Sequence, residues 1–292
     1  MARDADGTAI PTAGFALLGG SRIAASGAPE HDPRVTRVAQ DLVFMTPFGP
    51  TPPVDRLVLR SDEVAEERSI LAARLHAAPQ QRDRPQTVLA LFWVLQRAEV
   101  RRIVAETGAG SITQHFHPRD LIVPHDFIDF TPQVNGQLDP DAVLVMREPF
   151  CPEIREVLWH RARRFAAEKA TRVFNRAVYV AVQGPRFETA AEVAALARLG
   201  GDVIGQALAP EVGLAREIGA CYGVVQMVLN YAEGVRPEWD FDLLREIVRE
   251  GAEELGPVAL DALSALAAEP GCSCASYRKR PQPAEAAVPD TA

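Results

Sequence analysis

The chain alternates short runs of apolar, β-branched residues with longer segments whose apolar residues recur at helical spacing. Residues 14–20 are strand-like, 87–100 are helix-like, and 101–110 are strand-like again. Parallel strands need crossover connections of this kind, so the alternation predicts a mainly parallel sheet covered on both faces. Further strands are expected at 119–124, 177–184, 201–206 and 221–230, and further helices at 152–170, after Glu188, at 210–219 and, as one or two helices, at 240–269.

We therefore expect an α/β fold with a single domain over 14–270, in which helices flank a central, mainly parallel mixed sheet. Residues 1–13 and 275–292 are expected to be disordered, since the tail is rich in Pro and Ala and polar at its start. The first residues lack the apolar core of a secretory signal, which favours a cytoplasmic protein. No apolar run is long enough to span a bilayer, and the net charge of −8 argues against nucleic-acid or anionic-membrane partners.

The four cysteines give little indication of a metal. Cys272 and Cys274 form a CSC motif without a second pair, which offers too few ligands for a structural zinc site. Cys221 lies in an apolar strand and is expected in the core, and Cys151 stands alone. The CSC motif is compatible with a redox clip, whereas a cytosolic setting favours two reduced thiols. We expect no metal.

Ligands of parallel α/β sheets bind at the carboxyl ends of the strands. Two such ends, GGSR (19–22) and TGAGS (107–111), offer backbone N–H groups to an anion. GGSR is neither a Walker loop nor a dinucleotide fingerprint. Three further strand ends carry polar residues: QGPRFE (183–188), GQALAPE (205–211) and VLNY (228–231).

In this order the motifs resemble those of the trimeric purine nucleoside phosphorylase and methylthioadenosine phosphorylase family. The motifs that carry the resemblance are LLGGS (17–21), MTPFG (45–49), ETGAGS (106–111), DFIDFT (126–131), EPFCPEIREVL (148–158), GPRFETAAE (184–192) and GGDVIGQALAPEVGLAREIGACY (200–222). MTPFG and EPFCPEIREVL are most similar to the methylthioadenosine branch.

The resemblance implies the nucleoside phosphorylase fold and the phosphorolysis of a purine nucleoside to free base and sugar 1-phosphate. Inorganic phosphate would be the co-substrate, and no other cofactor is implied. The resemblance also implies a homotrimer in which a neighbour's loop completes each site, and 133–142 is the candidate for that loop.

The base-binding residues implied by the resemblance are Phe187, Glu188 and Asn230. A carboxylate only accepts hydrogen bonds, so Glu188 suits the N1–H of a 6-oxopurine and opposes adenine N1. The Asn230 amide can donate to N7 or O6, and Phe187 would stack on the base. We therefore expect hypoxanthine or guanine nucleosides as substrates. The alternative is that Glu188 caps the following helix and Phe187 is a core residue.

The phosphate site departs from the family pattern. Ser21, Arg74 and Thr107 match phosphate contacts, Gly108 matches a sugar contact, and His76 follows the arginine at the spacing of a catalytic histidine. Arg22, however, replaces a glycine, Ala207 a hydroxyl residue, and Gln206 a sugar-facing methionine. Two interpretations stay open. Arg22 and Arg74 hold phosphate in an altered way, or the protein is a phosphate-independent nucleosidase or a catalytically weak nucleoside binder.

The sugar 5′ position is expected next to Phe241. An apolar side chain there favours a 5′-deoxy or 5′-methylthio substituent over a free hydroxyl, which needs a polar partner. His115 and His117 have metal-like spacing but no companion ligand, and we expect a surface loop.

Overall fold

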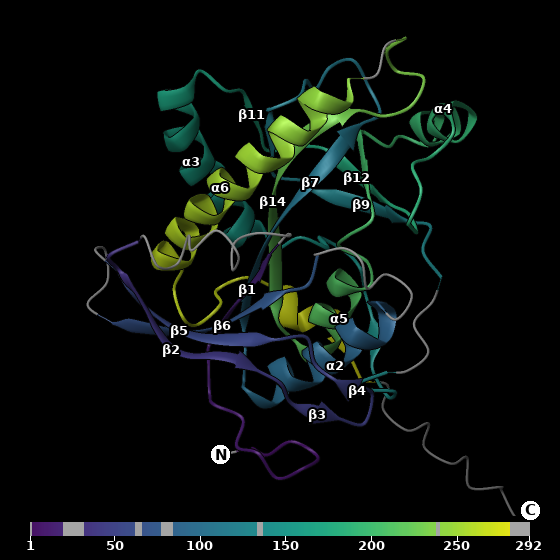
Figure 1. Ribbon diagram of the computed structural model, residues 1–292. Coiled ribbons are helices and arrows are strands. Elements are labelled where there is room, and N and C mark those ends of the chain that lie inside the picture. Colours follow the sequence, from purple (N-terminus) through teal and green to yellow (C-terminus); the bar gives the residue numbers. More distant parts are fainter. Residues whose placement is uncertain are drawn as a thin grey trace, which may run out of the picture.

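The computed structural model describes residues 2–19, 32–61, 66–76, 84–132, 137–237 and 240–280, and it contains a large mixed sheet (Figure 1). Along its main path the strands lie in the order β11 (Val173–Phe174), β8 (Leu121–Ile122), β14 (Cys221–Tyr231), β7 (Arg102–Ser111), β1 (Phe15–Gly19), β6 (Glu67–Arg74), β5 (Val54–Arg60) and β2 (Val35–Leu42). A branch adds β13 (Val203–Gly205), β12 (Val178–Ala181) and β9 (Asp126–Asp129).

The centre of the sheet is parallel, as the sequence predicts. β14, β7, β1 and β6 all run in the same direction. β5 and β2 continue the sheet as an antiparallel extension, and β13 pairs antiparallel with β7. β2, β5 and β6 were not predicted. The mainly parallel mixed sheet is therefore confirmed, with a larger antiparallel part than the sequence indicated.

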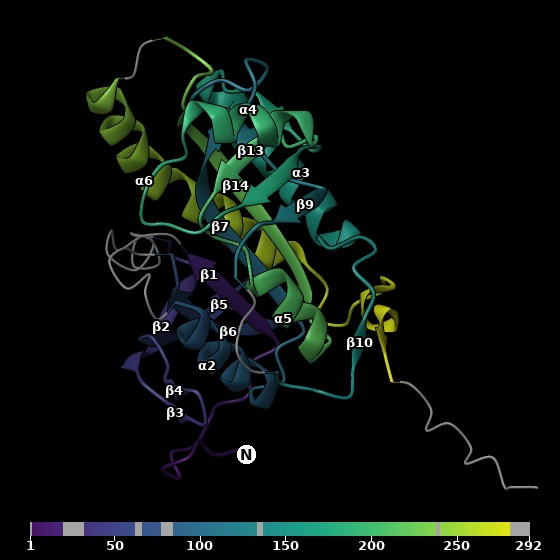
Figure 2. The same cartoon turned by 90° about the vertical axis from the view of Figure 1, so that its right-hand side faces the viewer.

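Helices cover both faces of the sheet (Figures 1 and 2). α2 (Arg84–Arg97) and α5 (Glu211–Ile218) pack on one face, and α3 (Pro152–Lys169) and α6 (Phe241–Ala265) pack on the other. Successive residues of β1 alternate between the two cores, because side chains of a strand point to opposite faces in turn. α4 (Ala190–Arg198) packs near the β12–β13 branch.

The two longest helices follow simple local rules. α3 starts with Pro152, whose missing N–H costs nothing in a first turn, and ends at Ala170 in a left-handed conformation with φ 53°. α6 is a single helix, one of the two expected possibilities, and it includes Pro257. Its start is capped by Asp240, whose carboxylate accepts from the Leu243 N–H at 2.9 Å. Among the described residues, no helix is long and apolar enough to cross a membrane.

The expected disorder of the termini is wrong for the parts that the structure describes. Ile10 is 1% exposed, and the N–H of Ala5 donates to Met45 O at 2.9 Å, so residues 2–13 pack against the domain. At the other end, the 3₁₀ helix η1 (Cys274–Tyr277) leads into β15 (Arg278–Lys279), which pairs with β10 (Val143–Leu144). The polar composition of 275–280 gave no indication of these backbone pairings. Met1 and residues 281–292 lie outside the described residues.

The description of CSC as a pair without companions is also wrong. The Cys272 and Cys274 side chains lie beside those of Cys151 and Cys221. Their segment reaches α3 and β14 only through the tertiary fold. Sequence spacing does not reveal this contact.

Candidate active site

A cavity of about 280 Å³ opens at the carboxyl ends of β7, β13 and β14, where a parallel sheet is expected to bind ligands. Its floor is formed by strand ends, one wall by the loop before α4, and another by the first turns of α6. The lining residues are Gly108, Ala109, Gly110, Pro185, Arg186, Phe187, Glu188, Ile204, Gly205, Gln206, Leu229, Asn230, Ala232, Glu233, Leu244 and Val248.

The end of β14 is positioned by a bulge against β7. Val228 pairs with Ala109, and Asn230 already pairs with Gly110, so Leu229 is the extra residue. A Cβ placed on Gly108 would come within 2.2 Å of Leu229 Cδ1. Gly108 is therefore required by packing, and its missing side chain lets the bulge bring Asn230 to the cavity.

The loop that carries Phe187 and Glu188 is held by its neighbours in sequence. The Thr189 hydroxyl accepts from the Glu192 N–H at 3.2 Å, and the Glu192 carboxylate accepts from the Thr189 N–H at 2.7 Å. These two bonds form a capping box at the start of α4. The alternative in which Glu188 caps this helix is therefore wrong.

Arg186 strengthens the same cap. Its guanidinium donates to both carboxylate oxygens of Glu192, at 2.7 and 2.8 Å. This hydrogen bond and the one from the Thr189 backbone lower the pKa of Glu192 to about 2. Phe187 is 54% exposed, so the alternative that makes it a core residue is wrong as well. Glu188 and Phe187 both line the cavity instead.

Two amide side chains border the cavity in fixed orientations. Asn230 Nδ2 donates to Tyr231 O at 2.9 Å, which uses one of its two N–H groups. Gln206 Nε2 donates to Arg186 O at 2.7 Å and so ties the end of β13 to the loop before α4. Gln206, Gly108, Phe187, Glu188 and Asn230 are thus brought together around one space.

The α6 wall of the cavity is apolar. Leu244 and Val248 line it, whereas Phe241, expected at the sugar 5′ position, is not among the lining residues. Phe241 begins α6 on the same helix face, is 53% exposed, and lies beneath the Arg245 guanidinium at 5.4 Å. Leu244, Val248 and Glu233 were not predicted from the sequence as cavity residues. The helical spacing of Leu244 and Val248 behind Phe241 is the signal that points to the first two.

Arg74 and Thr107 lie at the same sheet edge as the cavity. Arg74 ends β6 and pairs with Gly19, the last residue of β1, and Thr107 pairs with Gln226 in the β7–β14 ladder. The Arg74 guanidinium is partly exposed and lies 3.6 Å from a carboxylate oxygen of Asp41. Thr107 is buried. Ser21 and Arg22 lie outside the described residues, as do residues 133–136 of the candidate neighbour loop.

His76 is separated from the cavity lining and held by protein groups. Its Nε2 lies 2.8 Å from Glu211 Oε1, and its Nδ1 lies 3.1 Å from Glu106 O. The Tyr222 hydroxyl donates to the other Glu211 oxygen at 2.8 Å. Glu211 and Tyr222 were not predicted from the sequence as residues of this site. Glu211 is fully buried, and only the structure shows why a carboxylate is tolerated there.

Comparisons with known proteins agree with this geometry. Residues 84–264 match the Phosphorylase superfamily. The chain is 34% identical over 237 residues to a probable S-methyl-5′-thioinosine phosphorylase of Methanothermobacter thermautotrophicus, covering 79% of each chain. It is 35% identical over 196 residues to a 6-oxopurine nucleoside phosphorylase of Pyrococcus furiosus, covering 63% of this chain and 72% of the relative.

A solved structure has the same fold. The crystal structure of a methylthioadenosine phosphorylase from an antarctic soil metagenomic library superimposes with a TM-score of 0.71 at 25% identity. The match covers 86% of this chain and 85% of that one.

Proposed function

The chain belongs to the Phosphorylase superfamily, and on that premise we propose that it catalyses phosphorolysis of a purine nucleoside with a preference for 6-oxopurine bases. A phosphate oxygen attacks the anomeric carbon, the bond from that carbon to base N9 breaks, and the products are free base and sugar 1-phosphate. The single observation that carries the base preference is that Glu188 and Asn230 line one cavity.

Glu188 discriminates between bases through its hydrogen-bonding type. An ionised carboxylate accepts from the N1–H of hypoxanthine or guanine, and it also accepts from the 2-amino group of guanine. Adenine N1 is itself an acceptor, so adenine would leave two acceptors facing each other. A site built for one pattern rejects the other because buried polar groups are left unpaired.

Asn230 serves the leaving group. One N–H of its amide donates to Tyr231 O, and the other would donate to N7 or O6 of the base. Negative charge reaches the imidazole ring as the glycosidic bond breaks, and a preoriented donor stabilises the transition state more than the bound substrate. Phe187 covers the base face from the loop before α4.

The apolar wall of the cavity favours a substrate whose sugar carries an apolar 5′ substituent. Leu244 and Val248 would pack against a methylthio group, whereas a 5′-hydroxyl needs a polar partner. S-methyl-5′-thioinosine combines this substituent with a 6-oxopurine. It is the substrate that we propose.

The phosphate subsite is proposed at the edge shared by Arg74 and Thr107, next to the point where the chain leaves β1 towards Ser21 and Arg22. The Arg74–Asp41 ion pair is long and partly exposed, and such pairs contribute little stability. Phosphate can therefore replace Asp41 as the partner of Arg74 with little loss of stability. A bidentate contact between the guanidinium and phosphate would offset that loss.

A second candidate function is phosphate-independent hydrolysis of the same nucleosides. Two observations favour it. Ala207 has no hydroxyl to offer an anion, and both ring nitrogens of His76 already face protein acceptors. In this function water would take the place of phosphate, and the products would be free base and free sugar.

The proposed assembly is a homotrimer. Phe130 and Leu199 are exposed apolar side chains that line a second cavity of about 360 Å³, which Glu188 also borders. Phe130 comes shortly before the candidate neighbour loop 133–142 in the sequence. Association of copies would cover this surface.

The experiment that tests the function is base release from inosine, guanosine, S-methyl-5′-thioinosine and S-methyl-5′-thioadenosine, with and without phosphate. Release of hypoxanthine that requires phosphate and yields sugar 1-phosphate supports phosphorolysis. Release that does not depend on phosphate favours the hydrolase. Faster release of adenine than of hypoxanthine contradicts the base preference.

A further inference from the structure

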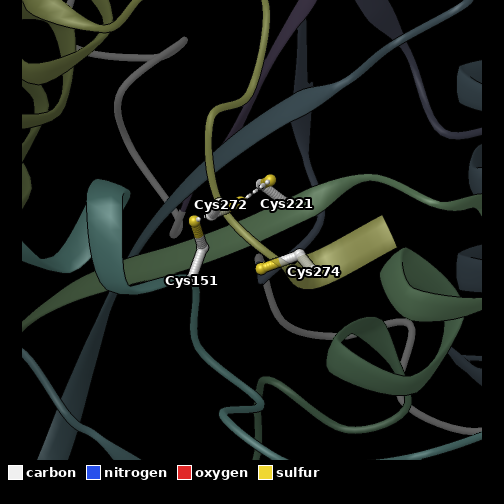
Figure 3. Close-up of side chains that lie close together, drawn as sticks. All are labelled: Cys151, Cys221, Cys272 and Cys274. Carbon is white, nitrogen blue, oxygen red and sulfur yellow. Dashed lines mark hydrogen bonds between the residues drawn. The ribbon is translucent and has the colours of Figure 1, made fainter. Parts of the chain in front are cut away.

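Four cysteine side chains meet at one point in the fold (Figure 3). The sulfur atoms of Cys151, Cys221, Cys272 and Cys274 all lie within 4.8 Å of one another. Cys272 Sγ lies 3.6 Å from Cys151 Sγ and 3.3 Å from Cys221 Sγ. All four residues are free cysteines, and three of them are buried. These are all the cysteines of the chain.

The four cysteines come from three separate parts of the chain. Cys151 immediately precedes α3, Cys221 is the first residue of β14, and the other two lie in the C-terminal segment at the start of η1. Each cysteine is small and apolar enough to be buried elsewhere in the core. Packing alone therefore does not explain why all four lie together.

The spacing of the sulfur atoms fits a tetrahedral metal ion. Zinc binds thiolates at about 2.3 Å, which places the four sulfurs of a tetrahedral site about 3.8 Å apart. The two measured separations, 3.6 and 3.3 Å, lie close to this value, and the remaining ones are at most 4.8 Å. We infer that these four cysteines bind one Zn²⁺ ion as a closed structural site.

The surroundings favour thiolates. Cys151 is the N-cap residue of α3, directly before Pro152 at the start of the helix. A helix N-terminus stabilises negative charge near it. Zinc binds cysteine as thiolate, so a zinc ion bound here would displace the thiol protons.

A buried cation lies beside the cluster. Arg102 pairs with Cys221 in the β7–β14 ladder, is 1% exposed, and forms an ion pair with Glu153 at 2.7 Å. The Arg102 guanidinium also donates to the carbonyl oxygens of Ala267 and Glu269, at 3.0 and 3.1 Å, in the segment that leads to Cys272. Zinc with four thiolates carries two net negative charges, and Arg102 offsets part of this charge.

The position of the cluster makes its role structural. Cys221 and Asn230 are nine residues apart on one strand, roughly 30 Å at about 3.3 Å per residue, so the cluster and the cavity lie at opposite edges of the sheet. The metal would fasten the C-terminal segment to the domain. That segment is otherwise held by Arg216, whose guanidinium donates to Cys274 O at 2.8 Å, and by the pairing of β15 with β10.

The test is metal analysis of the full chain, purified under reducing conditions without added metal or chelator. We expect about one zinc per chain, released when a mercurial reagent titrates the thiols. After zinc is removed, Co²⁺ added to the reduced protein should give the thiolate charge-transfer band and the intense red absorption of a tetrahedral cobalt site. These readouts need no nucleoside, so they are independent of the proposed function.

Two variants make the test specific. Loss of a group that only hydrogen-bonds to a metal ligand weakens metal binding by roughly 10- to 100-fold. Cys272→Ser removes a ligand itself, so it should weaken cobalt binding by more than this. Ser273→Ala, between the two ligands of the CSC motif, should leave the affinity and the cobalt spectrum unchanged.

Three outcomes overturn the proposal. The first is reduced wild-type protein that neither retains zinc nor develops the cobalt spectrum. The second is stoichiometric iron with a rubredoxin-like spectrum in the protein as isolated. The third is a pair of disulfides, found by mass analysis, together with failure of the reduced protein to bind either metal.

Discussion

Nε2 of His76 lies 2.8 Å from Oε1 of Glu211, and the two side chains are 4% and 0% exposed. Glu106 O faces the other ring nitrogen, and a carbonyl can only accept, so Nδ1 carries a proton. A hydrogen bond joins Nε2 to the Glu211 carboxyl group. The pair connects the end of β6 to the start of α5, which gives it a structural role.

Replacing Glu211 with Ala should destabilise the protein by about 3–5 kcal/mol, because it leaves His76 and the Tyr222 hydroxyl buried without their partner. Urea denaturation at several protein concentrations measures the loss. Glu233→Ala removes an exposed carboxylate and should stay within about 0.5 kcal/mol of the parent. Equal stability of the two variants would contradict the structural role of the pair.

Replacing Glu188 with Gln should lower kcat/KM for inosine by about 10- to 100-fold and narrow the preference for inosine over adenosine. The amide keeps one oxygen that can accept from N1–H, but it loses the negative charge and adds a donor that can face adenine N1. The matched control is Glu192→Gln, which weakens the cap of α4 and should lower the melting temperature without changing the ratio of the two substrates. If Glu192→Gln changes the ratio of kcat/KM for inosine and adenosine and Glu188→Gln does not, the assignment of Glu188 to base recognition is contradicted.

Replacing Asn230 with Asp should move the preference towards 6-aminopurines by about tenfold or more, since the carboxylate accepts from an exocyclic amino group and cannot donate to O6. Competition between S-methyl-5′-thioinosine and S-methyl-5′-thioadenosine in one reaction measures the shift directly. Asn175→Asp, at an exposed position before β12, introduces the same charge and should leave the competition unchanged.

Replacing Gly108 with Ala should cost about 1–3 kcal/mol, because the new Cβ would overlap Leu229 Cδ1. Thermal or urea unfolding measures this cost. Gly213→Ala in α5 meets no atom within 4 Å and should be neutral or stabilising by up to about 1 kcal/mol. Combining Gly108→Ala with Leu229→Ala should cost less than the sum of the two single changes, and strict additivity would argue against the overlap.

The pKa of Glu192 should be measurable near 2 by carboxyl NMR, and Arg186→Gln should raise it, because the hydrogen bond from Arg186 is the main cause of its depression. The folded pKa lies below the ordinary value of 4.5. The contribution of this group to stability is therefore present above pH 4.5 and is lost as the pH falls towards 2. Arg198→Gln, on the same helix, is the control that should leave the pKa near 2.

Local patterns in the sequence accounted for much of the fold. The apolar run of β7 and the amphipathic spacing of α3 each extend over about ten to twenty neighbouring residues. A strand or a helix forms from neighbouring residues, so such patterns predict it. The β2–β5 extension was missed because β2 is largely polar and half-exposed, with no continuous apolar run to mark it. The ordered segment 275–280 was missed because its stability comes from pairing with Val143 and Leu144, far away in sequence.

The sequence by itself determined the class of fold and, from residue 87 onward, most of the order of its elements, because these follow from local spacing. The resemblance of its motifs to a known family selected Glu188 and Asn230 as the residues of interest. The Thr189–Glu192 capping box, which excludes Glu188 as the cap of α4, is a local pattern that was not predicted from the sequence. Only the tertiary structure decided the contacts between remote segments. It placed His76 against Glu211 and gathered the four cysteines from three segments. The physical reason is that a hydrogen bond or a metal ligand depends on separations of a few ångströms, and for residues remote in sequence those separations are set only when the sheet and its helices pack.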